Sequence, residues 1–413
     1  MSVVEIFKAA KASSSALARA NSNLKNSALE NFALELEGNI PKILEANALD
    51  IQNAIENGVA AGLQDRLKLD QPRISSLAKA VRLIIALPDP IGQSVDGMTL
   101  PNGLKLQQVR VPFGVVGVIY EARPNVTVDI SALALKSGNA VLLRGGSAAQ
   151  NTNRVLVELI QAGLAKAGLP ASAVQTIDPY GREGSVEMMQ ARGYVDVLIP
   201  RGSAQLIRTV VTESKVPVIE TGDGVVHMFV DETADLEKTV PMVLNAKVQR
   251  PSVCNALETL LVHQDIASVA LPKIAKALEA SGVTIHGCEE TLKLVTGVPA
   301  TETDWETEYY SLDLSVKVVA DLDEALSHIS KYSTHHTESI ITENQSNAER
   351  FLQEVDSAVV MVNASTRFTD GGEFGFGAEV GISTQKLHAR GPMGLRELTS
   401  TKWLVRGNGQ VRD

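Results

Sequence analysis

The spacing of apolar residues divides the chain into stretches with different periodicities. In residues 3–87, apolar positions recur at helical spacing, and the sequence LPDP at 87–90 ends this stretch. The sequence PNG at 101–103 then predicts the turn of a hairpin that spans about 93–111. After residue 115, continuous apolar runs alternate with amphipathic segments, which predicts buried strands joined by helices.

The apolar runs fall into two sets, and each set predicts a parallel sheet. The first set predicts strands at 115–120, 140–143, 174–177, 195–199 and 216–220, with helices at 126–136, 153–166, 183–192 and 203–214. The second set predicts strands at 227–230, 256–262, 283–286, 314–319, 339–341 and 359–362, with helices at 236–248, 266–280, 322–332 and 345–354. The first set has enough strand–helix steps for a dinucleotide-binding domain. The segment GDG at 222–224 is the predicted hinge, and a final strand is expected at 402–405.

Composition is typical of a soluble globular protein. The 413 residues are 44% hydrophobic, and the mean hydropathy is +0.05. A net charge of −10 argues against nucleic acid as the main partner. Two cysteines make no disulfide framework, which favours a reducing compartment. Because the first dozen residues lack the apolar core of a signal peptide and no apolar run is long enough for a membrane span, we expect a cytoplasmic protein.

Cys254 is the residue whose surroundings most favour chemistry. It lies in a polar, basic segment, QRPSVCN at 249–255, just ahead of an apolar run. Positive charge on the nearby Lys247 and Arg250 favours the nucleophilic thiolate. A catalytic cysteine here would pass through a covalent thioester or thiohemiacetal. Basic neighbours alone leave the alternative of a small buried structural residue open, and for Cys288 that alternative is the expectation.

Polar and glycine-rich segments follow several strands of the first set. A parallel sheet binds ligands beyond the carboxyl ends of its strands. Gly202 and Ser203 open a predicted helix, whose free N–H groups attract phosphate, and Arg144 offers a planar guanidinium for the same purpose. The sequence G-x-G-x-x-G is missing, and a Gly-Ser pair before a helix is equally compatible with an ordinary N-cap. No metal site is expected at the neighbouring His335 and His336, because successive residues of a strand point to opposite faces.

Three segments resemble the glutamate-5-semialdehyde dehydrogenase family, a branch of the aldehyde dehydrogenase superfamily. They are VPFGVVGVIYEARPNVT at 111–127, residues 249–258 around Cys254, and FGFGAEVGISTQKLHARGPMGL at 374–395. The resemblance covers essentially the whole chain and implies an α/β fold of the aldehyde dehydrogenase type. Its parts would be a doubly wound cofactor domain with N-terminal helices at 1–222, a catalytic cysteine domain at 223–362, and a return segment with a tail strand at 363–413. The hairpin at 93–111 and the tail strand would form a small β arm that pairs protomers into a dimer or tetramer.

The resemblance also implies roles for single residues. Cys254 matches the nucleophile, and Asn125 matches the asparagine that stabilises the oxyanion. Arg144 takes the place of a lysine that holds the adenosine ribose or its 2′-phosphate, which favours NADP(H) as the cofactor. The remaining matches are Gly202 and Ser203 for the pyrophosphate, Glu308 for the nicotinamide ribose, and the cations Arg123, Lys247, Arg250 and Arg367 as candidates for the substrate anions.

Glu220 matches the glutamate of the superfamily's Glu-Leu-Gly-Gly motif, but the sequence departs from that motif. It reads Glu-Thr-Gly-Asp-Gly at 220–224. In hydrolytic relatives this glutamate activates water, and an enzyme that releases phosphate needs no such water. Glu220 is therefore kept as a cofactor-binding candidate, and its role as a general base is in doubt.

The implied activity is the NADPH-dependent reduction of L-glutamyl 5-phosphate to L-glutamate 5-semialdehyde, the second step of proline biosynthesis from glutamate. A Cys254 thioester would form as phosphate leaves. One alternative is a hydrolytic NAD(P)-dependent aldehyde dehydrogenase, and another is a non-catalytic scaffold of the same fold. The glutamate 5-kinase that makes the labile acyl phosphate is an expected partner on chemical grounds.

Overall fold

The computed structural model describes residues 2–59, 61–121 and 123–412. Ala122, which belongs to the segment 111–127 discussed above, lies outside them. The chain divides into two compact units. The first unit comprises Met1–Glu220, Gly375–Gly381 and Met393–Asp413, and the second comprises Thr221–Phe374 and Ile382–Pro392. The first boundary falls next to the predicted one at 222, whereas the segment predicted at 363–413 is shared between the two units.

Helices fill the N-terminal stretch of the first unit, as the helical spacing predicts. They are α1 (Val3–Arg19), α2 (Ser22–Gly38), α3 (Ile40–Glu56), α4 (Ala61–Leu67) and α5 (Gln71–Ala86). The first begins with a capping box between Ser2 and Glu5. The last follows the N-cap Asp70 and ends at Ala86; its C-cap Leu87 is extended, since the proline that follows disfavours helical backbone there. Among the described helices, none combines the length and apolar character that a membrane crossing requires.

A parallel sheet with the strand order β5-β4-β3-β6 forms the core of the first unit. Its strands are β3 (Val115–Tyr120), β4 (Ala140–Arg144), β5 (Val174–Thr176) and β6 (Val197–Arg201), and its helices are α6 (Pro124–Lys136), α7 (Gln150–Lys166), α8 (Gly181–Met189) and α9 (Ala204–Glu213). Short 3₁₀ turns precede some of these elements: η1 (Ser147–Ala149), η2 (Ala171–Ala173) and η3 (Asp178–Tyr180). The continuous apolar run of β3 is buried at every position, which confirms the predicted buried strand.

The predicted strand at 216–220 is wrong. Within the described residues, this segment makes an isolated bridge between Leu198 and Val218, so the sheet has four strands. The bridge rests on hydrogen bonds from Leu198 N–H to the Pro217 carbonyl (2.8 Å) and from Ile219 N–H to the Leu198 carbonyl (2.9 Å). Proline has no N–H to extend such a ladder.

The second unit contains a larger parallel sheet, with the strand order β10-β9-β11-β8-β7-β12-β13. Its strands are β7 (Val226–Val230), β8 (Leu257–His263), β9 (Thr284–Gly287), β10 (Val298–Pro299), β11 (Asp313–Val319), β12 (Thr337–Ile341) and β13 (Val359–Val362). Its helices are α10 (Leu236–Val248), α11 (Gln264–Ala280), α12 (Glu289–Leu292), α13 (Glu302–Trp305), α14 (Leu322–Tyr332) and α15 (Gln345–Glu354), and η4 (Thr366–Phe368) follows the sheet. The apolar pattern predicted every strand of this sheet except the two-residue β10.

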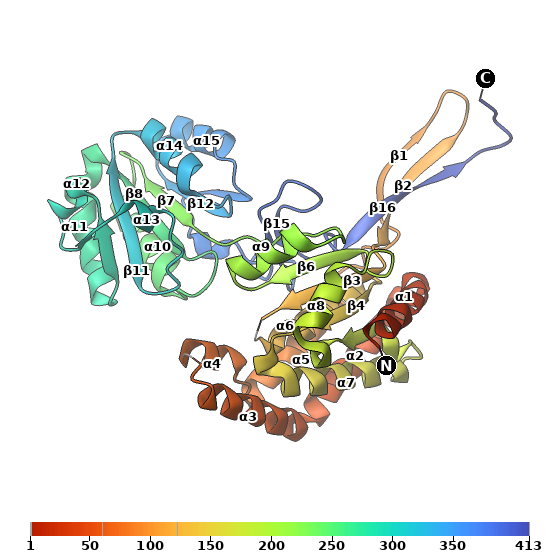
Figure 1. The fold of residues 1–413 in the computed structure, drawn as a ribbon. Coiled ribbons are helices and arrows are strands. Elements are labelled where there is room, and N and C mark those ends of the chain that lie inside the picture. The colour runs from red at the N-terminus through yellow and green to blue at the C-terminus, as the bar shows by residue number, and fades with distance from the viewer. Residues whose placement is uncertain (1, 60, 122, 413) are drawn as a thin grey trace. The chain divides into compact units, whose positions relative to one another are not determined.

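A three-stranded antiparallel arm belongs to the first unit (Figure 1). Its strands are β1 (Ser94–Thr99), β2 (Lys105–Pro112) and β16 (Thr399–Arg406), and β2 lies in the middle. The predicted hairpin and tail strand are thus confirmed, and they pair with each other. Exposed apolar side chains on the two edge strands are Val95, Met98, Trp403 and Val405. A further short pair, β14 (Gly381–Ser383) and β15 (Gly391–Met393), lies in the return segment.

Candidate active site

Cys254 lies in the turn between α10 and β8 of the second unit. Its side chain is half-buried, and neither cysteine is in a disulfide within the described part of the chain. The next residue, Asn255, is buried and anchors the turn: its Nδ2 donates to the Thr369 carbonyl (2.7 Å), and its own carbonyl accepts from Thr366 Oγ1 (2.8 Å). The candidate nucleophile therefore stands on a backbone that residues far along the chain hold in place.

The glycine-rich segment 222–224 packs closely within the same unit. A Cβ on Gly224 would stand 1.5 Å from the Cys254 carbonyl oxygen, so no side chain fits there. A Cβ on Gly222 would stand 2.2 Å from Thr384 Cγ2. The flanking backbone is tied to Thr334, whose Oγ1 donates to the Asp223 carbonyl (2.6 Å) and accepts from Val225 N–H (3.0 Å). These glycines therefore serve close packing around the cysteine turn, in addition to marking the boundary predicted as a hinge.

Two arginines of the candidate substrate set are charged neighbours in this region. Arg367 is half-buried, and its Nε donates to Gln249 Oε1 (2.8 Å). Burial lowers the pKa of Arg367, and the charges of Cys254 and Arg250 also act on it. A guanidinium that interacts with the Cys254 charge favours the thiolate in return. The structure thus brings Cys254, Arg250 and Arg367 together.

Lys247 is placed differently from these arginines. It is fully buried in the last turn of α10, and its Nζ lies 2.5 Å from Oε2 of the equally buried Glu258. Burial lowers the pKa of Lys247 and raises that of Glu258 to about 8. Because the ammonium group is committed to an internal ion pair, its position argues against a role in holding a substrate anion.

Glu308 also belongs to the second unit. Burial raises the pKa of its carboxyl group, and the Tyr310 hydroxyl and the nearby Gly224 N–H act in the opposite direction. Tyr310 donates to Glu308 Oε2 at 2.5 Å. The other oxygen, Oε1, is buried and makes no hydrogen bond with any residue that the structure describes. A buried acceptor of this kind fits a sugar hydroxyl, so Glu308 suits the ribose of a nucleotide cofactor.

In the first unit, a carboxylate occupies the N-terminus of α9. Ser203 is the N-cap, and its backbone N–H and Oγ donate to the two oxygens of Glu121 (3.1 and 2.8 Å). The backbone of Gly202 approaches the same group, since a Cβ there would lie 2.7 Å from Glu121 Cδ. An anion thus already interacts with the donors proposed to bind the cofactor pyrophosphate, and the donor set fits a phosphate.

The guanidinium group of Arg144 binds backbone carbonyl groups, so it is not already arranged to hold a phosphate. Its Nη1 donates to the Gly145 carbonyl (2.5 Å) and its Nε to the Gly181 carbonyl (3.3 Å). A cavity of about 230 Å³ near the carboxyl end of β5 is lined by Gln150, Asn151, Arg154, Thr176, Asp178 and Pro179. Asp178, whose pKa is raised by burial, also interacts with the Arg144 charge. The exposed Arg154 had no sequence signal, because it lies inside α7, away from any strand end.

The other predicted residues of the first unit lie near the start of α6 and at the chain boundary. Arg123 is the N-cap of α6 and is half-buried. Asn125 is exposed in the first turn, and its Nδ2 donates to Asp129 Oδ2 (3.4 Å). Burial raises the pKa of Asp129 to about 6. Glu220 is half-buried at the end of the first unit's main segment. The sequence motifs gave no sign of Asp129, which orients the amide of Asn125.

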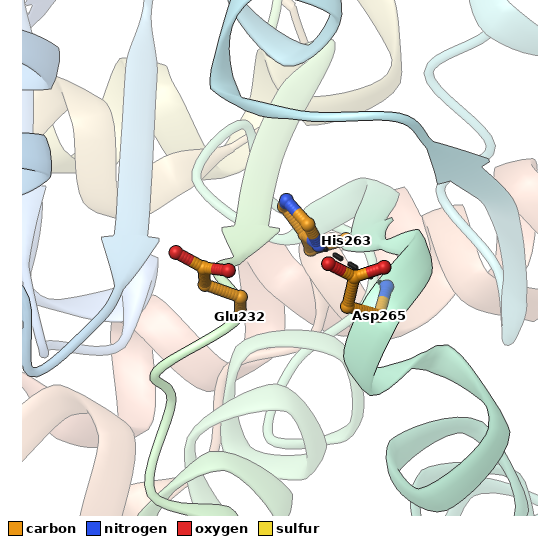
Figure 2. A group of neighbouring side chains, drawn as sticks. All are labelled: Glu232, His263 and Asp265. Atoms are coloured by element: carbon orange, nitrogen blue, oxygen red, sulfur yellow. Dashed lines mark hydrogen bonds between the residues drawn. The ribbon is translucent and has the colours of Figure 1, made fainter.

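Glu232, His263 and Asp265 form a group with metal-ligand chemistry near the start of α11 (Figure 2). Their ligand atoms lie within 4.8 Å of one another. However, His263 Nδ1 accepts a hydrogen bond from Asp265 N–H (3.1 Å) and so caps the helix. A neutral imidazole that accepts at Nδ1 carries its hydrogen on Nε2 and has no lone pair left for a metal. We therefore interpret this group as a helix cap.

Comparisons with known proteins agree with the resemblance found in the sequence. Residues 69–292 match the model of the aldehyde dehydrogenase family. The chain is 61% identical to the γ-glutamyl phosphate reductase of Clavibacter michiganensis, over 98% of this chain and 94% of the relative. It is 62% identical to that of Leifsonia xyli, over 100% of this chain and 98% of the relative. The crystal structure of γ-glutamyl phosphate reductase from Thermotoga maritima matches with a TM-score of 0.97 and 50% identity, and each chain is covered in full.

Proposed function

Because the chain belongs to the aldehyde dehydrogenase family, in its γ-glutamyl phosphate reductase branch, we propose that it reduces L-glutamyl 5-phosphate to L-glutamate 5-semialdehyde and releases phosphate. This reaction is the second step of proline biosynthesis from glutamate. The observation that carries the proposed chemistry is the turn of Cys254, which Asn255 anchors and which lies beside Arg250 and Arg367. The relatives favour neither a hydrolytic dehydrogenase nor a non-catalytic scaffold.

In the proposed mechanism, the Cys254 thiolate attacks the acyl carbon of the substrate. The bond between that carbon and the phosphate oxygen breaks, phosphate leaves with the electron pair, and a thioester to Cys254 forms. A nicotinamide cofactor, when bound, supplies the hydride that reduces this thioester. Hydride addition leaves the thiohemiacetal as its alkoxide, and collapse of that alkoxide breaks the C–S bond, releases the semialdehyde and returns the thiolate with no net proton transfer.

Arg250 and Arg367 are the proposed partners of the substrate anions in the second unit. Arg367 interacts electrostatically with Cys254 and with Arg250, and the partial burial of Arg367 strengthens its attraction for an anion. Lys247 is left out of this set, because its ammonium group is buried against Glu258. Arg123 remains a proposed contact in the first unit, since it precedes Asn125 at the start of α6.

Asn125 is the proposed donor to the oxyanion of the tetrahedral intermediates, together with the backbone N–H of Cys254. Its Nδ2 has two hydrogens, and one of them is directed at Asp129. The second hydrogen remains for the developing negative charge on the substrate oxygen. Asp129 thereby fixes which side of the amide carries the donor.

NADP(H) is the proposed form of the nicotinamide cofactor. Gly202 and Ser203 would bind its pyrophosphate at the N-terminus of α9, where a carboxylate already binds. Glu308 would accept a hydrogen bond from the nicotinamide ribose through Oε1. Arg144 would pair with the 2′-phosphate after its hydrogen bond to the Gly145 carbonyl breaks. Glu220 is kept as a further candidate contact for the cofactor.

The arm of β1, β2 and β16 is the proposed contact between protomers of a dimer or tetramer. Among the described strands, each edge strand pairs with β2 alone, and their exposed apolar side chains include Met98 and Trp403. Contact with glutamate 5-kinase remains a proposal based on the lability of an acyl phosphate. The cytoplasm remains the proposed compartment.

The test of the mechanism compares Cys254→Ser with the matched control Cys288→Ser. Activity is measured with the semialdehyde, phosphate and NADP⁺, by following NADPH absorbance. We expect Cys254→Ser to lose more than about a thousandfold in kcat/KM and Cys288→Ser to stay close to wild type. Cys254→Ser turning over near the wild-type rate would rule out the thioester. NADPH formation that does not require phosphate would favour the hydrolytic alternative.

A further inference from the structure

Tyr310 has an unusual backbone conformation for an aromatic residue. Its φ angle is +56°, in the left-handed region that residues other than Gly, Asn and Asp seldom adopt. It follows Glu308 closely in the chain, within the loop between α13 and β11. Such a conformation persists when surrounding interactions determine it, and it is common at functional sites. The backbone of Tyr310 is therefore held by contacts of its surroundings, among them those of its own side chain.

The hydroxyl group of Tyr310 lies among the charged groups of the candidate active site. It donates to Glu308 Oε2 at 2.5 Å, although 47% of the residue is exposed. Burial of the hydroxyl raises the pKa of Tyr310, and the charges of Glu308 and Cys254 raise it further. The phenol thus remains protonated and acts as a permanent donor. The backbone of Gly224, which approaches the Cys254 carbonyl, also acts through its N–H on Glu308, so the pair of Tyr310 and Glu308 lies close to the candidate nucleophile.

The neighbouring Tyr309 is oriented toward different partners. Its hydroxyl donates to Asp304 Oδ1 (2.7 Å) and lies 2.9 Å from Ser315 Oγ. Its ring stacks on His286 and lies under the Lys247 ammonium group. Two adjacent tyrosines therefore have separate partners: Tyr309 binds Asp304 and stacks on His286, and Tyr310 binds Glu308. This difference makes Tyr309 a matched control.

We propose that Tyr310 is a positioning residue for the cofactor. Its hydroxyl donates to Oε2 of Glu308, which favours the ionised carboxylate and leaves the buried Oε1 as the acceptor for a ribose hydroxyl. The inference rests on the proposed role of Glu308 and names the residue that makes this role effective. The strained backbone of Tyr310 is the means by which the hydroxyl reaches back to Glu308 within so short a stretch of chain.

Tyr310→Phe removes the hydroxyl and keeps the ring. NADPH binding is measured directly by fluorescence titration across a range of pH, with Tyr309→Phe as the control. We expect the dissociation constant to rise about tenfold for Tyr310→Phe, as for the loss of a hydrogen bond to a charged group. Loss of the donor also raises the pKa of Glu308. As the pH is lowered, the carboxylate of the variant therefore becomes protonated at a higher pH than that of the wild type. The defect should therefore widen toward low pH, whereas Tyr309→Phe should keep the wild-type pH profile.

Glu308→Gln separates the two levels of the proposal. If neither Glu308→Gln nor Glu308→Ala, which removes the acceptor oxygen, changes the NADPH dissociation constant, the proposed role of Glu308 fails, and the role of Tyr310 fails with it. If Glu308→Gln weakens binding and Tyr310→Phe does not, the positioning role alone is wrong. In the double variant, Tyr310→Phe should add little to Glu308→Gln, because the hydroxyl acts through the carboxylate. A different result would be that Tyr310→Phe weakens NADPH binding equally at every pH and that its loss adds fully to that of Glu308→Gln in the double variant. Tyr310 would then contribute by packing, which overturns the inference.

Discussion

Gly224 lies so close to Cys254 that a Cβ on the glycine would stand 1.5 Å from the cysteine's carbonyl oxygen and 2.4 Å from its carbonyl carbon. The contact is between two backbone segments, so no rotation of a side chain relieves it. A residue with a side chain at position 224 must displace the turn that presents the thiol.

Gly224→Ala is therefore expected to impair catalysis through the position of Cys254. A shift of about 1 Å in a reacting group costs on the order of a hundredfold in rate, so kcat/KM should fall by at least that factor. The matched control is Gly38→Ala, since a Cβ at Gly38 meets nothing within 4 Å. The measurements are steady-state activity and the rate of Cys254 alkylation. Wild-type activity in Gly224→Ala would show that the turn tolerates the displacement.

Most of the strands and the candidate nucleophile were within reach of sequence reasoning because their signals are local. The apolar run of β3 and the basic segment around Cys254 each lie within a few consecutive residues. The contact of Gly224 with Cys254 joins segments far apart in the chain, and no local pattern encodes it. The absent strand at 216–220 has a local cause that the apolar pattern hides, which is the missing N–H of Pro217.

Lys247 shows a second limit of sequence reasoning. Its nearness to Cys254 in sequence suggested a cation for the active site, but α10 turns the side chain inward to Glu258. A helix places neighbours in sequence on different faces, so proximity along the chain does not settle which charge meets which group. Glu121 illustrates the converse, because its contact with Ser203 crosses from one strand end to another.

Lys247→Met should destabilise the protein and extend the pH dependence of its stability to higher pH. Removing one partner of a buried ion pair costs about 3–5 kcal/mol in the free energy of unfolding. Without the ammonium group, the pKa of Glu258 rises above its present value of about 8, so the folded state binds a proton that the unfolded state does not. Stability is then retained at low pH and lost as pH rises above the unfolded carboxyl pKa.

Urea unfolding of wild type and Lys247→Met at about pH 7.5 and about pH 9.5, on either side of the wild-type Glu258 pKa, checks this prediction. The difference in unfolding free energy should be larger at the higher pH. The double variant Lys247→Met, Glu258→Gln removes both charges and should recover part of the loss. A difference that is equal at both pH values would mean that the cost arises from packing.

Glu121→Gln should increase the affinity for NADP(H). The carboxylate occupies the Ser203 donors and the N-terminus of α9, where a cofactor phosphate would have to displace it. Removing its charge should lower the NADPH dissociation constant about threefold to tenfold. This change corresponds to the free energy with which a charge interacts with a helix terminus. The control is Glu213→Gln, which changes an exposed charge at the other end of α9. Weaker NADPH binding in Glu121→Gln would instead make Glu121 a contact that the cofactor needs.

Arg144 and Arg154 are the two guanidinium groups whose positions suit recognition of a 2′-phosphate, and their variants should separate NADPH from NADH. Arg144 lies at the end of β4 and would have to release the Gly145 carbonyl, whereas the exposed Arg154 lines the cavity near the end of β5. If Arg144 binds the phosphate, Arg144→Ala should weaken the binding of NADPH about tenfold to a hundredfold and leave that of NADH nearly unchanged.

The measurements are KM and kcat with each cofactor, and competition by 2′,5′-ADP against 5′-AMP. Arg154→Ala is the companion variant, and an NADPH-specific loss confined to it would move the phosphate contact from β4 to the cavity. Equal losses with both cofactors in Arg144→Ala would assign that residue to the shared part of the nucleotide, since NADH lacks only the 2′-phosphate.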